Sequence, residues 1–153
     1  MYFVDRKKIT ITLSYMNSLL DILESKKEWE QDQVSQLALE RIGQNIIESI
    51  IDVGNSMIDG FIMRDPGSYE DIIDILTDES VITKEMDAPL KEVIEFRKHL
   101  VREFQSVNHE KLYHVLVSNI IILKQFPPKV EAYLINELGP VSAFLPEDSN
   151  VTL

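Results

Sequence analysis

Cysteine is absent from the 153 residues of the chain, and glycine and proline are scarce, with five and six residues. Without cysteine the chain cannot form a disulfide framework, a thiol nucleophile or a cysteine-ligated metal site. The scarcity of glycine and proline argues against a β-sandwich, whose many tight turns depend on both. A chain of this length buries about two-thirds of its unfolded surface on folding, so we expect it to fold without cross-links.

Long apolar runs are also missing. The longest runs, such as Ile120–Leu123, are far shorter than the ~20 residues that a membrane-spanning helix needs. The chain also becomes charged at Asp5–Lys8, where a signal peptide would have an apolar core. These features predict a cytoplasmic protein with no membrane partner.

The chain also has few positively charged residues: it contains 15 Lys and Arg residues and 26 Asp and Glu residues, which gives a net charge of −11. This balance argues against a uniformly basic nucleic-acid-binding surface but allows a local basic patch. Glycine-rich phosphate loops, Gly-x-Ser-x-Gly and His-Glu-x-x-His are absent. His109 and His114 stand five positions apart, on different sides of a helix, so we predict no metal site and no cofactor.

Helical periodicity runs through nearly the whole sequence. The first apolar stripe predicts a helix from about Asp5 to Ser25, and the next predicts a longer helix over Gln33–Gly60. The longer helix has a central apolar stripe and a second apolar flank, made by Leu39, Ile42, Ile46, Ile50, Val53 and Met57, and by Ile47, Ile51 and Ile58. So broad a face suggests burial against both the bundle and a partner chain, and Gly43 and Gly54 permit close packing. We therefore predict a homodimer.

Shorter helices follow. Ser68 is the predicted N-cap of a helix that ends near Thr77. A fourth helix, starting at Thr83 or Asp87, carries along one side Leu90, Val93, Ile94, Arg97, Val101 and Phe104. A fifth starts near His109 and is interrupted at Pro127–Pro128, before a last piece over 130–138. We predict an all-α up-and-down bundle of about five helices, with one domain over 1–140 and a flexible tail over 141–153.

The stretch Glu95–Phe104 carries the most informative chemistry. Arg97 falls at the centre of an apolar helix face, where an unpaired guanidinium is costly. It either forms a structural ion pair with a carboxylate of a neighbouring helix, such as Asp52 or Glu48, or opens onto a groove as an anion site. Another side of the same helix carries a small cationic patch, formed by Lys98, His99 and Arg102.

Five short motifs together are specific, and they are Leu39–Gln44, Asp52–Asn55, Met63–Tyr69, Arg97–Val101 and Glu137–Ser142. On these motifs the chain resembles the HepT-like family of small helical proteins, most closely its YutE-type branch. The resemblance implies a helical bundle, often dimeric, that is related to the HEPN ribonucleases. It also implies an RNA-cleaving toxin encoded beside a nucleotidyltransferase-type antitoxin. The family motif is Arg, four to six residues, His, any residue, Tyr, in which Arg and His act in cleavage and the antitoxin adenylylates Tyr.

The chain departs from this motif at two positions. Arg97 fits the motif arginine, but Arg102 stands at the histidine position and Phe104 at the tyrosine position. Arg102 cannot act as a neutral base because its guanidinium stays protonated, and Phe104 offers no hydroxyl for modification. Two cations can still bind phosphate and stabilise a charged transition state, which makes Arg97 and Arg102 the catalytic candidates.

Three functions remain open on the sequence. One is a HepT-like ribonuclease-family protein with a degenerate motif, which binds RNA or cleaves it weakly within a toxin–antitoxin-like pair. Its RNA-binding candidates are Arg97, Lys98, His99 and Arg102. The second is a non-catalytic dimeric partner of a nucleotidyltransferase-type protein, and the third is a self-associating scaffold with no nucleotide or RNA partner. The resemblance favours an Arg97 that faces a groove.

Overall fold

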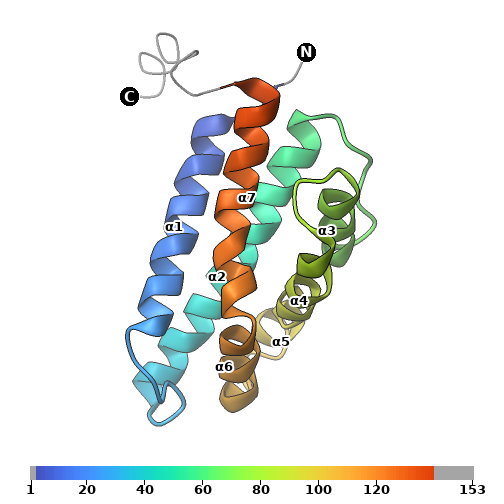
Figure 1. Cartoon of the computed structure of the whole chain (residues 1–153). Helices are drawn as coiled ribbons and strands as arrows, with labels where there is room; N and C mark the ends of the chain where they lie inside the picture. The colour runs from blue at the N-terminus through green and yellow to red at the C-terminus, as the bar shows by residue number, and fades with distance from the viewer. Residues whose placement is uncertain (1–2, 140–153) are drawn as a thin grey trace.

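The computed structural model describes residues 3–139, and over that range its secondary structure is entirely helical. The helices are α1 (Arg6–Glu24), α2 (Gln33–Gly60), α3 (Tyr69–Asp78), α4 (Lys84–Glu95), α5 (Arg97–Val101), α6 (His109–Ser118) and α7 (Ile120–Leu138). A single residue separates α4 from α5 and α6 from α7, and Figure 1 shows the arrangement of the helices. The predicted all-α bundle is confirmed, whereas the tail predicted over 141–153 lies outside the described residues and the domain boundary stays a prediction.

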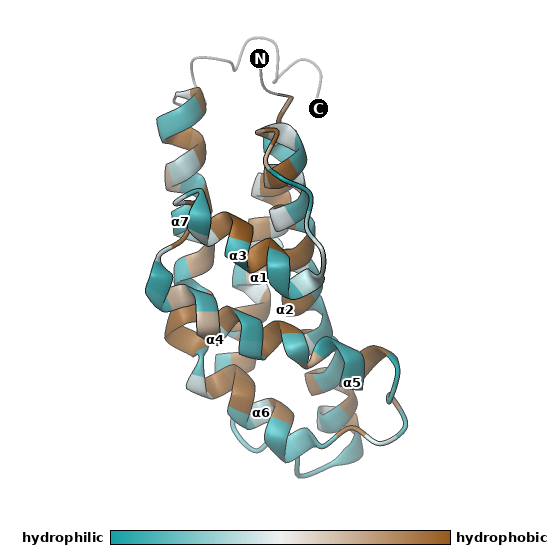
Figure 2. Cartoon of the chain, turned by 90° about the vertical axis from the view of Figure 1, so that its right-hand side faces the viewer, coloured by the Kyte–Doolittle hydropathy of each residue, from teal (hydrophilic) through white to brown (hydrophobic). Residues whose placement is uncertain are grey.

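Helix α1 packs against both α2 and α7, and α2 also contacts α3, α5 and α6. Polar and apolar residues alternate along the helices, as amphipathic packing requires (Figure 2). Within residues 3–139, no helix combines the length and apolar character needed to cross a membrane.

Helix α2 forms the centre of the core, with the bounds predicted from its periodicity. It begins where the Asp32 side chain accepts a hydrogen bond from the Ser35 amide at 2.9 Å. The central stripe is buried, and so are Ile47, Ile51 and Ile58 on the second flank, all within the single chain. The other helices of the same chain therefore bury the broad apolar face. Its breadth is no argument for a homodimer, and that inference is wrong. The homodimer itself stays a prediction.

Two glycines of α2 allow neighbouring helices to approach closely, although inside one chain. A Cβ atom on Gly54 would lie 2.3 Å from Cγ2 of Ile72 in α3, a distance that a real side chain cannot adopt. A Cβ on Gly43 would lie 3.1 Å from Cδ1 of Leu112 in α6. The predicted role of both glycines in helix packing is confirmed for contacts with α3 and α6.

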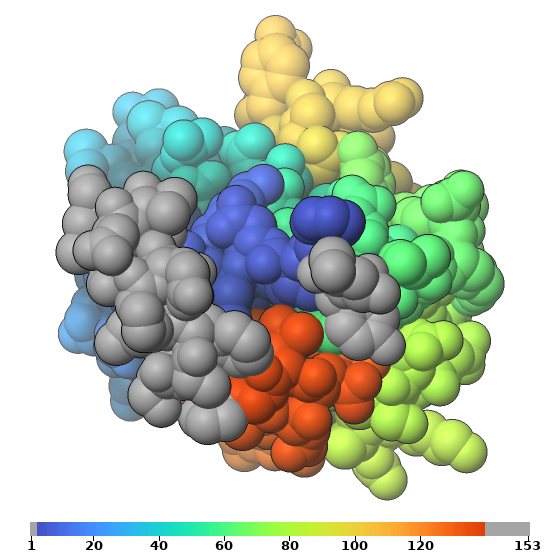
Figure 3. Space-filling model, turned by 90° about the horizontal axis from the view of Figure 1, so that it is seen from above, coloured from blue at the N-terminus to red at the C-terminus, as the bar shows by residue number. Residues whose placement is uncertain are grey.

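The predicted fourth helix is too long, because it breaks at Phe96. The Phe96 amide donates to the Val93 carbonyl, three residues back instead of four, which tightens the turn and shifts the phase of everything that follows. Val101 and Phe104 therefore leave the apolar side and are 37% and 60% exposed. The helix starts after Thr83, which places Pro89 in its interior. Seen from above, the chain around residue 100 stands out from the body (Figure 3).

The predicted interruption at Pro127–Pro128 is also wrong, because α7 runs through both prolines. The break lies at Asn119, whose side-chain amide donates to the Val115 carbonyl at 2.8 Å and to Glu92 at 2.7 Å. Pro127 is buried in the helix interior, together with its neighbour Phe126. Burial of these side chains offsets the backbone hydrogen bonds that proline cannot form.

Candidate functional site

Helix α5 presents an inner side to the bundle and an outer side to solvent. Arg97 lies on the inner side, where its Nε donates to Oε2 of Glu48 in α2 at 2.7 Å and its Nη2 to Oε1 at 3.4 Å. Its guanidinium carbon lies 4.6 Å from the centre of the Tyr69 ring at the start of α3. The hydrogen bond with Glu48 raises the pKa of Arg97 above its usual value. Arg97 thus joins α5 to α2 and α3, which is the structural ion pair that the sequence offered as one alternative.

The outer side of α5 carries the other three candidates. Lys98 is exposed, and its Nζ lies 3.6 Å from Oε1 of Glu95. Arg102 is exposed and forms no ion pair with any residue between 3 and 139. Nδ1 of His99 lies 2.6 Å from Oε1 of Glu103. The predicted cationic patch therefore lies on accessible surface.

The structure separates Arg97 from this patch. At ~100° per residue, positions 97 and 102 differ by roughly 140° around the helix, and positions 97 and 99 by roughly 200°. Arg97 faces Glu48, while Arg102 faces solvent. The two catalytic candidates therefore do not converge on one substrate atom within this chain.

Phe104, at the tyrosine position of the family motif, lies just beyond α5 and is largely exposed. Val101 is partly exposed on the same segment. An accessible aromatic ring beside cationic side chains is the combination on which unpaired nucleic-acid bases stack. The outer side of α5 therefore combines exposed cations with an exposed aromatic ring.

A partly buried polar contact that the sequence did not predict joins α6 to α2. Nε2 of His109 lies 2.6 Å from Oε2 of Glu40, and both side chains are about one-fifth exposed. The two residues stand 69 positions apart, so no local spacing could have revealed the pair. The contact fixes the first turn of α6 on α2, beside the close approach at Gly43.

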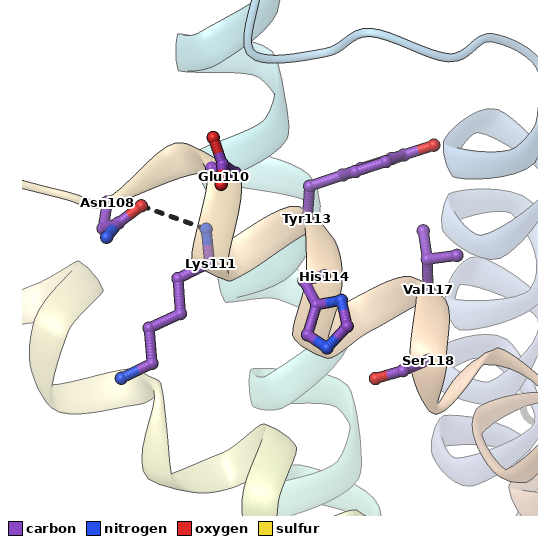
Figure 4. A pocket seen from close by; sticks show the side chains of 7 residues that line it. All are labelled: Asn108, Glu110, Lys111, Tyr113, His114, Val117 and Ser118. Atoms are coloured by element: carbon purple, nitrogen blue, oxygen red, sulfur yellow. Dashed lines mark hydrogen bonds between the residues drawn. The ribbon is translucent and has the colours of Figure 1, made fainter.

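An open pocket of about 630 Å³ lies along α6 (Figure 4). It is lined by Asn108, Glu110, Lys111, Tyr113, His114, Val117 and Ser118. None of its lining residues comes from α5, so the pocket is separate from the cationic patch. Among residues 3–139 no three His, Asp or Glu side chains gather closely enough to hold a metal ion.

The described geometry can be compared with known proteins. A family model described as HepT-like, ribonuclease HepT-like, matches residues 12–130. A relative named “Putative RNase YutE”, from Bacillus subtilis (strain 168), is 49% identical over 144 residues, which cover 94% of this chain and 99% of the relative.

Two solved structures have the same fold. One is described as the cytosolic protein of unknown function YutE from Bacillus subtilis. It matches with a TM-score of 0.89 and 47% identity, over 92% of this chain and 97% of that chain. The other is a tri-AMPylated Shewanella oneidensis HEPN toxin in complex with MNT antitoxin, with a TM-score of 0.68 and 21% identity over 82% and 95% of the two chains. At that identity the second likeness shows the fold alone.

Proposed function

The chain belongs to the ribonuclease HepT-like family, and on that premise we propose that it binds RNA on the outer side of α5 and cleaves it slowly. The observation that carries the proposal is Arg102, an exposed guanidinium without an ion pair in residues 3–139, on a protein of net charge −11. In an otherwise acidic molecule such a group is available for phosphate.

The neighbours of Arg102 supply the other contacts that RNA needs. Lys98 adds a second phosphate-binding cation, and its 3.6 Å separation from Glu95 leaves that pairing weak. Phe104 offers its exposed ring to an unpaired base. The guanidinium of Arg102 can stabilise the charge that develops on phosphate during cleavage. In this proposal Arg97 does not contact RNA; it holds α5 on α2 through its ion pair with Glu48.

We further propose a cytoplasmic toxin–antitoxin-like pair with a nucleotidyltransferase-type protein. The solved YutE structure is described as that of a cytosolic protein, and the Shewanella oneidensis toxin of the same fold is in complex with MNT antitoxin. Phe104 cannot accept AMP because it has no hydroxyl. A partner of this kind would therefore inhibit the protein by covering α5.

The proposal of a homodimer now rests on exposed apolar side chains. Ile11, Tyr15 and Ile22 lie along one side of α1, and Val34 and Leu37 lie at the start of α2. The two helices are joined across this surface by a 2.6 Å hydrogen bond from Asn45 to Tyr15. Light scattering at micromolar concentration tests this proposal, and a Leu37→Asp variant should shift a dimer to monomer.

Anisotropy titrations with a labelled single-stranded RNA test the main proposal. Arg102→Ala and Lys98→Ala should each weaken binding and reduce the slope of log Kd against log salt by about 0.7, because each removes one phosphate contact. Lys129→Ala, which removes an exposed cation from α7, is the matched control and should leave binding unchanged. Equal losses in all three variants would mean that binding depends on net charge and not on α5.

A non-catalytic binding partner is the second candidate, and the exposed pair Val101 and Phe104 favours it. Apolar side chains beside charged ones form protein interfaces as well as RNA platforms. If the wild-type protein forms a stable complex with a nucleotidyltransferase-type protein yet neither binds nor cleaves RNA, this alternative replaces the main proposal.

A further inference from the structure

We propose that His99 is the proton acceptor for RNA cleavage on the outer side of α5 and that Glu103 is its positioning residue. The inference rests on the proposed ribonuclease function and identifies the group that this function requires. Arg102 occupies the motif position of the base, and a guanidinium that stays protonated cannot remove a proton. Another side chain must therefore accept it.

The chain offers three histidines for this task, and their surroundings differ. His109 is committed to Glu40 through its Nε2 atom at 2.6 Å and is mostly buried between α6 and α2. His114 lines the open pocket along α6 (Figure 4). His99 is the histidine on α5, beside the exposed cations.

The contact with Glu103 prepares His99 to accept a proton. A carboxylate can only accept hydrogen bonds, so the 2.6 Å contact places a hydrogen on Nδ1 of His99. In the neutral ring the lone pair then lies on Nε2, on the far side from Glu103. The ring also packs against Phe96, with centres 5.1 Å apart and planes tilted by 58°, which limits its rotation. The His99 side chain is 37% exposed, so a substrate can reach it.

The position of His99 on the helix brings it next to Arg102. Residues three apart are neighbours on a helix surface, and the backbone of Arg102 still has helical geometry. His99 thus lies about one helical turn before position 102, where the family motif has its histidine, and on the same side of the helix. A proton acceptor and a cation for the phosphate thus lie side by side on accessible surface.

The chemical step that this pair supports is transfer of the phosphate to the neighbouring 2′-hydroxyl. Nε2 of His99 takes the proton of the 2′-hydroxyl, and the 2′ oxygen forms a bond to phosphorus as the bond from phosphorus to the 5′ oxygen breaks. Arg102 neutralises the charge that builds up on the phosphate oxygens. The 5′ oxygen takes a proton from water, and the imidazolium returns its proton to solvent. The products are a 2′,3′-cyclic phosphate and a 5′-hydroxyl.

Single-turnover cleavage of a labelled single-stranded RNA tests the role of His99, with His114→Ala as the matched control. His99→Ala should lower the rate by about 10²- to 10⁴-fold, the usual contribution of a positioned acid or base, with an unchanged thermal melt. Added imidazole should restore part of the rate, since it replaces the missing ring. His114→Ala should cleave like the wild type.

Glu103→Gln tests the positioning role through a signal that is independent of cleavage. With wild-type protein, ¹⁵N NMR of the His99 ring should show the hydrogen on Nδ1. In Glu103→Gln the hydrogen should be shared between both ring nitrogens, and the cleavage rate should fall on the order of tenfold, because the neutral amide no longer selects one tautomer.

The outcomes separate this inference from the proposed function. If the wild type and His99→Ala cleave RNA at the same rate, the assignment of His99 is wrong while the ribonuclease function stands. If the wild type binds RNA and does not cleave it, the cleavage function and the assignment both fail, and RNA binding remains. If His99→Ala is inactive and imidazole restores nothing, His99 acts on structure or binding and not as the proton acceptor.

Discussion

Arg97 and Arg102 lie five residues apart on either side of one short helix, and their surroundings are opposite. Arg97 is bound by Glu48 at 2.7 Å and covered by the Tyr69 ring, whereas Arg102 is exposed and has no ion pair within residues 3–139. The arginine that best fits the family motif is thus the one that is already satisfied by the fold. The difference teaches that the motif arginine holds α5 on α2, whereas the outer side of α5 keeps an exposed guanidinium.

Helix α2 and the outer side of α5 differ in the same way. Around α2 there is little room for a larger or charged side chain, since a Cβ atom on Gly54 would lie 2.3 Å from Ile72. On the outer side of α5, Lys98, Arg102 and Phe104 are exposed, so substitutions there should change binding with little effect on folding.

The largest effect is expected at Ile46, which is fully buried in the middle of α2. Ile46→Asp would place an uncompensated carboxylate in the core and should cost roughly 3–5 kcal/mol, a large share of the stability of a typical domain. Ile121→Asp is the matched control, because it makes the same change in α7 at a side chain that is 69% exposed. Urea unfolding followed by circular dichroism measures both, and similar midpoints for the two variants would contradict the packing of α2 described above.

A smaller effect is expected from Gly54→Ala. Its new methyl group would collide with Cγ2 of Ile72, a branched atom close to the backbone of α3. After the ~1 kcal/mol that alanine gains in a helix is subtracted, the variant should lose about 1–2 kcal/mol. Gly43→Ala meets only the flexible ends of Leu112 and Leu116 and should stay within about 0.5 kcal/mol of wild type. Thermal unfolding measures this pair, and equal stabilities would show that α3 can move away from α2 at little cost.

The same substitution at the two arginines tests the comparison most directly. Arg97→Met removes the partner of Glu48, whose side chain is 39% exposed and can be rehydrated, so we expect a loss of about 1–2 kcal/mol. Its affinity for RNA should change less than twofold. Arg102→Met should keep the wild-type melting temperature and lose most RNA affinity. Melts and anisotropy titrations on both variants decide between these roles, and the reverse pattern would make Arg97 the RNA contact.

The smallest effect, and one that depends on pH, is expected at Asp71. Its carboxylate accepts hydrogen bonds from Arg64 at 2.8 and 2.9 Å and from the Gly67 amide at 2.8 Å, which lower the pKa of Asp71 from 3.8 to about 2. Because the pKa in the folded state is the lower one, the stabilisation is complete above about pH 4 and is lost as the pH falls towards 2. Asp71→Asn should melt below wild type at pH 7, and the two melting curves should converge near pH 2. A constant difference across this range would assign the effect to packing.

Much of the fold could be predicted because it is encoded locally. Apolar spacing fixed the bounds of α2, and the cap at Ser68, whose Oγ accepts from the Asp71 amide at 3.0 Å, marked the start of α3. The breaks at Phe96 and Asn119 could not be predicted, because phenylalanine does not itself break a helix and the partner of Asn119, Glu92, is 27 residues away in the sequence. Pro127 is the reverse case, a helix breaker that packing accommodates.

The candidate site was predictable to a similar extent. Helical angles separated Arg97 from Lys98, His99 and Arg102, and Glu48 was one of two carboxylates expected to pair with Arg97. The choice between an ion pair and an open groove needed the tertiary structure, since positions 48 and 97 are distant in sequence. The contact between His99 and Glu103 was not predicted, although their separation of four residues is the spacing at which helix side chains meet.

The two prolines inside α7 have a consequence for amide hydrogen exchange. Neither Pro127 nor Pro128 has an amide hydrogen, so two successive bonds to the carbonyls of Leu123 and Lys124 are missing from the helix. Beyond this gap the last turns of α7 depend on packing of Val130 and Leu134. They should therefore open as a separate cooperative unit, with faster deuterium uptake than the amides of α2, while the rest of the bundle stays closed.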